Sequence, residues 1–257
     1  MNNYSHQLMA MFQIMAIFWT LNTSVFSQGL SAIEIIKKAD EKQRGDYSHG
    51  EMKMTIIRPD WTRETTMKMW SYKDELSLIL ITAPARDKGT SFLKRSREMW
   101  NWQPTIDRVI KLPPSMMSQS WMGSDFTNDD LVKQSSIIYD YAHNITGEAN
   151  VEDRNCWEIT LIPKEDAAVV WGKVIIWIDK KDFLELKTEF YDEDDYLVNT
   201  MYGREIGKLG GKILPHILEV IPADKEGHIT RIEYLNLNFS TPIKESFFSI
   251  RNMQIVR

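Results

Sequence analysis

The pattern of hydrophobic and polar positions first indicates a helix. Ser31 and Glu34 have the spacing of a capping box, and apolar residues then recur at helical spacing as far as Arg44. Gly45 follows as a helix terminator. The pattern predicts one amphipathic helix, and the residues expected to face a sheet are Leu30, Ile33 and Ile36.

Beyond Gly50 the hydrophobic period changes to that of β-strands. Apolar and polar residues alternate over 52–57 and 65–70, and the run 76–81 is apolar on both faces. Short strands joined by tight turns are typical of an antiparallel meander rather than of alternating strand–helix units. Short strands are expected to follow around 91–94, 99–102 and 108–112. Later strands are expected at 137–141, 156–162, 173–178, 184–191, 198–202, 213–221 and 228–239, with a last one at 253–256.

These strands predict a mainly β (α+β) protein with a single sheet. About eleven strands in one twisted sheet will curl, and a helix can then cover the concave side. The clearest strand is 184–191, where Leu184, Leu186, Thr188 and Phe190 alternate with charged residues. One face of the sheet is therefore expected to be apolar and the other exposed to solvent.

The stretch 113–131 interrupts the strand pattern. It contains Pro113-Pro114, Gly123 and many Ser, Asp and Asn residues, which exclude a strand, and Asp125 or Thr127 is suited to cap a short helix. A long excursion of this kind usually covers or gates part of a sheet.

The N-terminus has the features of an export signal. An apolar run from Leu8 to Trp19 is long enough for a signal-peptide core and short for a membrane-spanning helix. We expect cleavage between Ser27 and Gln28, which leaves one domain over 28–257; an uncleaved anchor is the alternative, because Lys and Arg are missing before the run. No Cys lies near this point to carry a lipid.

Composition narrows the possible functions. The only cysteine is Cys156, and an exported protein without a disulfide fits a bacterial periplasm better than a eukaryotic secretory route. The net charge of −5 argues against a protein that coats nucleic acid. The 14 Met and 9 Trp residues suit either an adaptable apolar binding surface or an ordinary Met-rich core.

The sequence lacks a recognisable catalytic set. Four histidines outside the signal are scattered without ligand spacing, and a single Cys cannot build a usual zinc site. The acidic run 192–195 lacks the Gly and the distal Glu of a calcium loop. No G-x-S-x-G motif or phosphate-binding Gly loop is present. We therefore expect no enzyme activity, no metal and no cofactor.

The centre of the chain resembles the outer membrane lipoprotein-sorting family. The likeness rests on 84–94 (PARDKGTSFLK), 99–104 (MWNWQP), 108–112 (RVIKL) and, most specifically, 120–131 (SWMGSDFTNDDL). The resemblance implies a LolA-like fold, an unclosed half-barrel of antiparallel strands with helices over its concave face. It also implies a periplasmic carrier that shuttles acyl chains of lipoproteins, or another lipid, from an inner-membrane transporter to an outer-membrane acceptor.

Carriage needs an apolar cavity and a movable cover. We expect 115–131 to be that lid and alternate strand residues to form the wall, although a shift of one residue turns any wall residue outward. Carriers of this family lock the lid with an arginine, and Arg86 and Arg108 lie nearest the family blocks without a clear match. The expected wall residues are Met52, Met54, Met67, Met69, Leu78, Leu80, Trp100, Trp102, Ile176 and Leu186, and the expected lid residues are Met116, Met117, Trp121, Met122 and Phe126.

Other functions remain open at this point. A lipid-sensing regulatory domain on the same fold would be favoured by a membrane tether or a second domain, and the sequence shows neither. An accessory protein of an efflux-type lipid exporter would differ from a lipoprotein carrier only in its cargo. A lipid hydrolase would need the nucleophile motif that is missing.

Overall fold

The computed structural model describes residues 29–132 and 136–257, so the predicted export signal lies outside the described residues. Helix α1 (Ala32–Arg44) starts after Ser31, whose backbone N–H donates to Glu34 Oε2 over 2.8 Å, and stops at Gly45. The predicted helix is therefore confirmed. Its buried residues are Ala32, Ile35, Ile36 and Ala39.

Two residues expected on the buried face of α1 are not buried. Leu30 is 37% exposed and lies before the helix, and Ile33 is only half-buried. A period of 3.6 residues aligns Ile35 with Ala32 and Ala39, so the face is turned relative to the predicted one.

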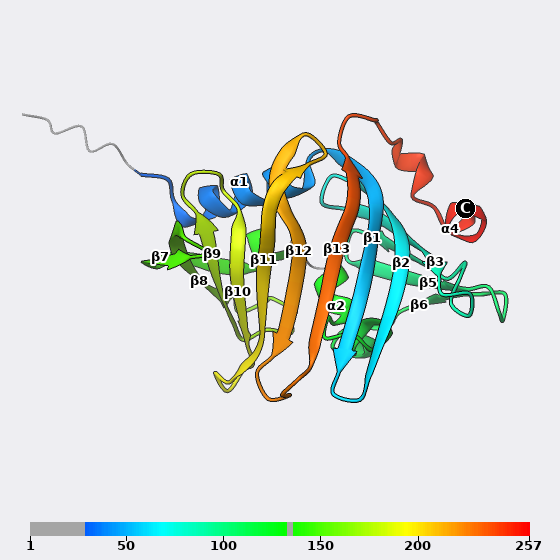
Figure 1. Cartoon of the computed structure of the whole chain (residues 1–257), viewed down its shortest axis with the longest axis horizontal. Helices are drawn as coiled ribbons and strands as arrows, with labels where there is room; N and C mark the ends of the chain where they lie inside the picture. The colour runs from blue at the N-terminus through cyan, green and yellow to red at the C-terminus, as the bar shows by residue number, and fades with distance from the viewer. Residues whose placement is uncertain (1–28, 133–135) are drawn as a thin grey trace, which may run out of the picture.

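All strands belong to one antiparallel sheet of 13 strands in the order β6-β5-β4-β3-β2-β1-β13-β12-β11-β10-β9-β8-β7. Two meanders are joined where β1 pairs with β13, and the edges β6 and β7 do not pair, so the sheet stays open (Figure 1). The strands are β1 Tyr47–Arg58, β2 Trp61–Tyr72, β3 Leu76–Ala83, β4 Ser91–Arg95, β5 Glu98–Gln103, β6 Arg108–Lys111, β7 Tyr141–Val151, β8 Arg154–Pro163, β9 Lys173–Asp179, β10 Glu185–Tyr191, β11 Leu197–Leu209, β12 Lys212–Pro222 and β13 Ile229–Asn238.

The mainly β, unclosed antiparallel sheet is as expected, but the count of about eleven was too low. The edge strand β7 has Asn144, Thr146 and Glu148 on its exposed side, and most residues of its other side are only half-buried. Its backbone pairs with β8 on one side only, so side-chain burial leaves little trace in its sequence.

Two predicted strands are helices in the structure. The stretch 137–141 mostly belongs to α3 (Ser136–Tyr139), and 253–256 mostly belongs to α4 (Ile250–Ile255). In α4, Ser249 is the N-cap, because its hydroxyl accepts the N–H of Asn252. An apolar run of four residues contains too few positions to separate a period of two from one of 3.6.

The excursion 113–131 is confirmed as a break in the strand pattern. It contains two 3-10 turns, η1 (Pro114–Met116) and η2 (Trp121–Gly123), followed by α2 (Asn128–Val132). In Figure 1, α2 lies behind β12 and β13, and α1 crosses behind the upper ends of β10, β11 and β12.

The two faces of β3 bury different clusters. Ile79 belongs to the cluster of β1 and β2 that includes Trp121, whereas its neighbour Leu78 packs with Phe248 of the C-terminal segment, which contains η3 (Glu245–Phe247) and α4. Successive residues of a strand point to opposite faces. This part of the sheet is therefore covered on both sides.

Candidate functional site

A cavity of about 250 Å³ lies between the sheet and the segments that contain α1, α2 and α3. Apolar residues predominate in its lining, for example Ile36 of α1, Ile138 of α3, and Val174, Val220 and Ile232 of the sheet. The helical side and the strand side thus bury one continuous apolar space. Such a space suits a flexible hydrophobic ligand.

The four methionines expected in the wall lie on the cavity side of β1 and β2. Met52 and Met69 line the cavity, whereas Met54 and Met67 are fully buried in the cluster that contains Met52. Met52 pairs with Met67 across the two strands, so the alternation assigns both to the same face.

Leu78, Leu80, Trp100 and Trp102 do not line this cavity. Three of them, all but Leu80, pack in or against the cluster under Phe248 on the opposite face. The prediction that these residues face the cavity is therefore wrong. The C-terminal segment covers the second face of these strands, so both faces carry apolar residues. Alternation of apolar and polar residues then cannot tell which face lines the cavity.

Ile176 lines the cavity, but Leu186 does not. The pairing of β10 with β9 shifts between Glu185 and Lys187, and this bulge places Glu185 in the lining position. Leu186 packs instead with Cys156 and other buried residues. A bulge of this kind reverses the faces that alternation predicts.

The five residues expected on the lid divide into different environments. Met117, Met122 and Phe126 are partly buried against the cluster of β1 and β2, and Phe126 also lines the cavity. Met116 is partly exposed. Trp121 is only 1% exposed and packs edge-on against Phe92, with ring centroids 5.5 Å apart. Trp121 therefore belongs to the core.

An arginine does anchor the expected lid segment, and it is Arg58. Its Nη1 donates to Asp125 Oδ2 and its Nη2 to Asp125 Oδ1, each over 3.0 Å, and the two side chains are 9% and 6% exposed. Such a bidentate, desolvated pair fixes both groups in one geometry. Arg86 pairs with the adjacent Asp87 at the surface and Arg108 is exposed, so neither holds the segment.

Further bonds tie the same segment to the sheet. Asp125 N–H donates to Thr230 Oγ1 over 3.0 Å, and Thr230 Oγ1 donates to Asp125 Oδ2 over 2.6 Å. Arg63 of β2 donates to the carbonyl of Met122. The anchors come from β1, β2 and β13, and no local sequence pattern signals them because the Arg58 and Asp125 positions lie 67 residues apart.

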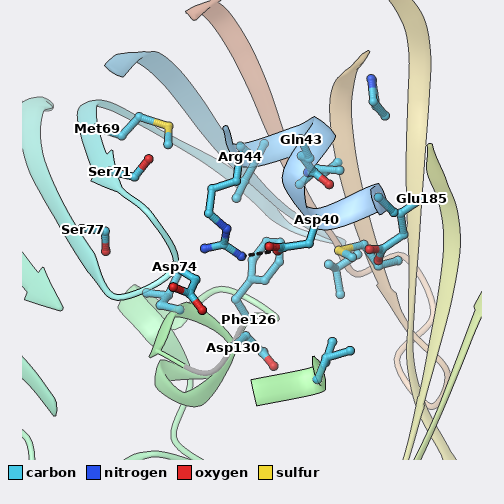
Figure 2. A pocket seen from close by; sticks show the side chains of 18 of the residues that line it. Asp40, Gln43, Arg44, Met69, Ser71, Asp74, Ser77, Phe126, Asp130 and Glu185 are labelled. Atoms are coloured by element: carbon cyan, nitrogen blue, oxygen red, sulfur yellow. Dashed lines mark hydrogen bonds and ion pairs between the residues drawn. The ribbon is translucent and has the colours of Figure 1, made fainter. Parts of the chain in front are cut away.

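One end of the cavity is polar. There, Arg44 Nη2 lies 2.5 Å from Asp40 Oδ1, and Lys94 Nζ donates to the carbonyl of Asp74 over 2.8 Å. Figure 2 shows Arg44 reaching from α1 toward Asp74 with Asp40 beside it. Burial and the charge of Arg44 lower the pKa of Lys94 to about 8. No local sequence pattern marks these residues as a group.

The carboxyl groups of Asp130 and Glu185 also lie in the cavity wall. Asp130 accepts hydrogen bonds from Trp171 Nε1 over 3.1 Å and from the N–H of Thr127 over 2.7 Å, and burial raises its pKa. Burial also raises the pKa of Glu185, which accepts a hydrogen bond from Thr188. Both groups already have donors.

Cys156 is a fully buried residue of β8. Burial raises the pKa of its thiol to about 11. We expect a disulfide reagent such as Ellman's reagent to label native protein at pH 8 at least about a hundredfold more slowly than urea-unfolded protein, because the thiolate is the reactive form. Equal rates would contradict this.

Membrane-spanning helices and metal-binding clusters were sought among the described residues, 29–132 and 136–257. None of their helices is long and apolar enough to cross a membrane. Within the same ranges, His, Cys, Asp and Glu side chains do not gather in groups of three or more that could hold a metal ion.

Comparison with known proteins places the chain among related sequences and folds. A family model described as uncharacterized protein matches residues 73–255. A DUF1329 family protein from Desulfovibrio piger is 25% identical, with a TM-score of 0.80 over 87% of this chain and 98% of that chain. No curated protein matches the sequence.

Two further solved structures share the fold. A domain assigned to outer membrane lipoprotein sorting, from Vibrio parahaemolyticus, is 23% identical with a TM-score of 0.77 over 87% of this chain and 98% of its own. A LolA superfamily protein from Nitrosomonas europaea is 22% identical with a TM-score of 0.73 over 86% of this chain and 98% of its own. The fold that the resemblance of the central blocks implied is thereby confirmed.

Proposed function

Because the chain belongs to the family whose model matches residues 73–255, and has the fold of LolA-like lipoprotein-sorting proteins, we propose that it is a carrier of acyl chains. The observation that supports this most directly is the apolar cavity between the sheet and the helical segments. We propose that the carrier domain spans 28–257, after an export signal at 1–27, and acts in the periplasm as a binding protein rather than an enzyme.

The energetics of carriage agree with the design of the cavity. Each methylene removed from water contributes about 0.8 kcal/mol, so even part of an acyl chain is held firmly in a space closed to water. An empty carrier must also hide this apolar surface, since a large exposed patch would promote aggregation. A cover that both closes and opens meets the two demands.

We propose that residues 115–131 form this cover and that the Arg58–Asp125 pair holds it closed. The pair joins the segment to the end of β1, and Phe126 contributes to the cavity wall beneath it. Cargo entry then requires the pair to separate, which replaces one buried contact by two hydrated charges. As the resemblance to the lipoprotein-sorting family implies, an inner-membrane transporter would supply the cargo and an outer-membrane acceptor would receive it.

The cavity predicts binding of a hydrophobic probe. Met69→Trp adds bulk at a lining position, so we expect it to weaken the affinity for N-phenyl-1-naphthylamine at least about tenfold, the equivalent of about two displaced methylenes. Lys68→Trp, on the opposite face of the same strand, is the matched control and should bind like the unaltered protein. Fluorescence titration measures both.

The outcomes separate the possible functions. Failure of the unaltered protein to bind the probe would overturn carriage, as would equal binding by Met69→Trp and Lys68→Trp. Mass spectrometry of lipid extracted from the purified protein identifies the cargo. Acylated peptide supports lipoprotein sorting, whereas a glycerolipid or an isoprenoid supports export of another lipid.

A further inference from the structure

The polar end of the cavity holds hydrogen-bond donors without matching acceptors. A guanidinium carries five N–H groups. Among the described residues, Arg44 contacts Asp40 through Nη2, and its buried Nε has no acceptor. Lys94 is 4% exposed, and of its three N–H groups the structure assigns one, to the carbonyl of Asp74. Buried donors of this kind are costly unless an acceptor reaches them.

Several of the carboxylates that line the cavity already have partners. Asp40 already pairs with Arg44, and Asp130 and Glu185 accept bonds from other residues. Burial also favours the neutral forms of Asp130 and Glu185. The buried Nε of Arg44 and the N–H groups of Lys94 beyond the one bonded to Asp74 can therefore donate to a negatively charged or oxygen-rich ligand group.

Hydroxyl groups extend this polar surface. Ser48 and Ser71 lie with their hydroxyl oxygens 2.7 Å apart, and both line the cavity together with Ser77. Figure 2 shows Ser71 and Ser77 on the strands that face Arg44. A hydroxyl can rotate to donate or accept, so these serines suit the oxygens of a bound head group.

We propose that the Arg44–Lys94 end of the cavity binds the anionic head of an amphiphile, a carboxylate or a phosphate, while the chain occupies the apolar part. This inference rests on the proposed carriage of acyl chains. Both cations are largely buried, so the head group would be enclosed with its chain. The cargo would then enter as a whole lipid rather than as the anchor of a protein that stays outside.

Lys94 lies among groups of both charges. The groups that face Lys94 are Arg44 and Asp40 of α1 and Asp74 and Glu75 of the β2–β3 turn. Burial and Arg44 lower the pKa of Lys94 to about 8, and these acidic groups oppose that shift only in part. An anion bound beside both cations would stabilise the protonated lysine.

The test compares amphiphiles that differ only in the head group. Displacement of N-phenyl-1-naphthylamine is measured with tetradecanoate, 1-tetradecanol and tetradecylamine. We expect the unaltered protein to prefer tetradecanoate to tetradecanol by at least about tenfold, the effect of one charge-assisted hydrogen bond. The double variant Arg44→Met/Lys94→Met should lose that preference and keep its affinity for tetradecanol. Sodium butyrate and inorganic phosphate, which lack the chain, should displace little probe.

Controls keep the result interpretable if the double variant folds poorly. Lys94→Arg retains the charge and should retain the preference, and Lys53→Met removes a cation that pairs with Glu233 away from the cavity and should change nothing. Equal affinity for tetradecanoate and tetradecanol, a preference for tetradecylamine, or displacement by butyrate equal to that by tetradecanoate would overturn the inference. Failure of every long-chain compound to bind would instead refute carriage itself.

Discussion

Replacing Arg58 with methionine is expected to lower the free energy of unfolding by about 3–5 kcal/mol. The change leaves the Asp125 carboxylate, only 6% exposed, without its guanidinium, and an uncompensated buried charge has a cost of this size. Urea denaturation followed by circular dichroism measures the loss. The double variant Arg58→Met/Asp125→Asn should regain a substantial part of it, because it removes both charges.

The matched control is Arg86→Met. Arg86 also pairs with an aspartate, but its side chain is 63% exposed, and loss of a hydrated ion pair changes stability within about 0.5 kcal/mol. A similar small effect for Arg58→Met would show that the pair does not anchor the 115–131 segment. A large effect in both variants would point instead to a general sensitivity to lost charge.

The second large effect is expected at Trp121. Trp121→Ser should lower the free energy of unfolding by roughly 3–5 kcal/mol, the usual cost of deleting a buried aromatic side chain, because Trp121 is 1% exposed and packs against Phe92. Phe126→Ser should cost less, since Phe126 is only partly buried, and should weaken probe binding, since it lines the cavity. Thermal unfolding and probe titration of both variants separate the roles.

Trp121→Phe is the conservative control. It keeps an aromatic ring beside Phe92 and removes an indole N–H that is buried without a partner among the described residues, so the loss should stay below about 1.5 kcal/mol. If Trp121→Ser kept its melting temperature and only weakened binding, Trp121 would instead belong to the underside of the cover, as the sequence alone suggested.

Sequence reasoning was most accurate where one face of an element is wet. The capping box before α1 and the Met-rich alternation of β1 and β2 predicted correctly a helix and a strand face, because neighbouring residues alone produce those periods. It was least accurate for apolar residues on both faces. Leu78 and Trp102 were assigned to the cavity wall, yet they pack under Phe248, which follows them by more than a hundred residues.

The cavity itself depends on contacts that the sequence does not display. A one-residue shift in the β9–β10 pairing exchanges Leu186 for Glu185 in the wall, and hydrogen bonding between strands decides such a shift. The donors at Arg44 and Lys94 become a cluster only because the C-terminal end of α1 lies close to the β2–β3 turn and to β4.

By itself, the sequence determined the antiparallel character of the sheet, the position of α1 and the interruption at 113–131, since turn residues and hydrophobic periods are local properties. The family blocks further indicated a carrier fold, which the solved structures bear out. Only the tertiary structure decided which strand residues face the cavity and that Arg58 meets Asp125. Those relations depend on strand pairing and side-chain burial between segments that are distant in the sequence, and local hydrophobic periodicity does not predict them.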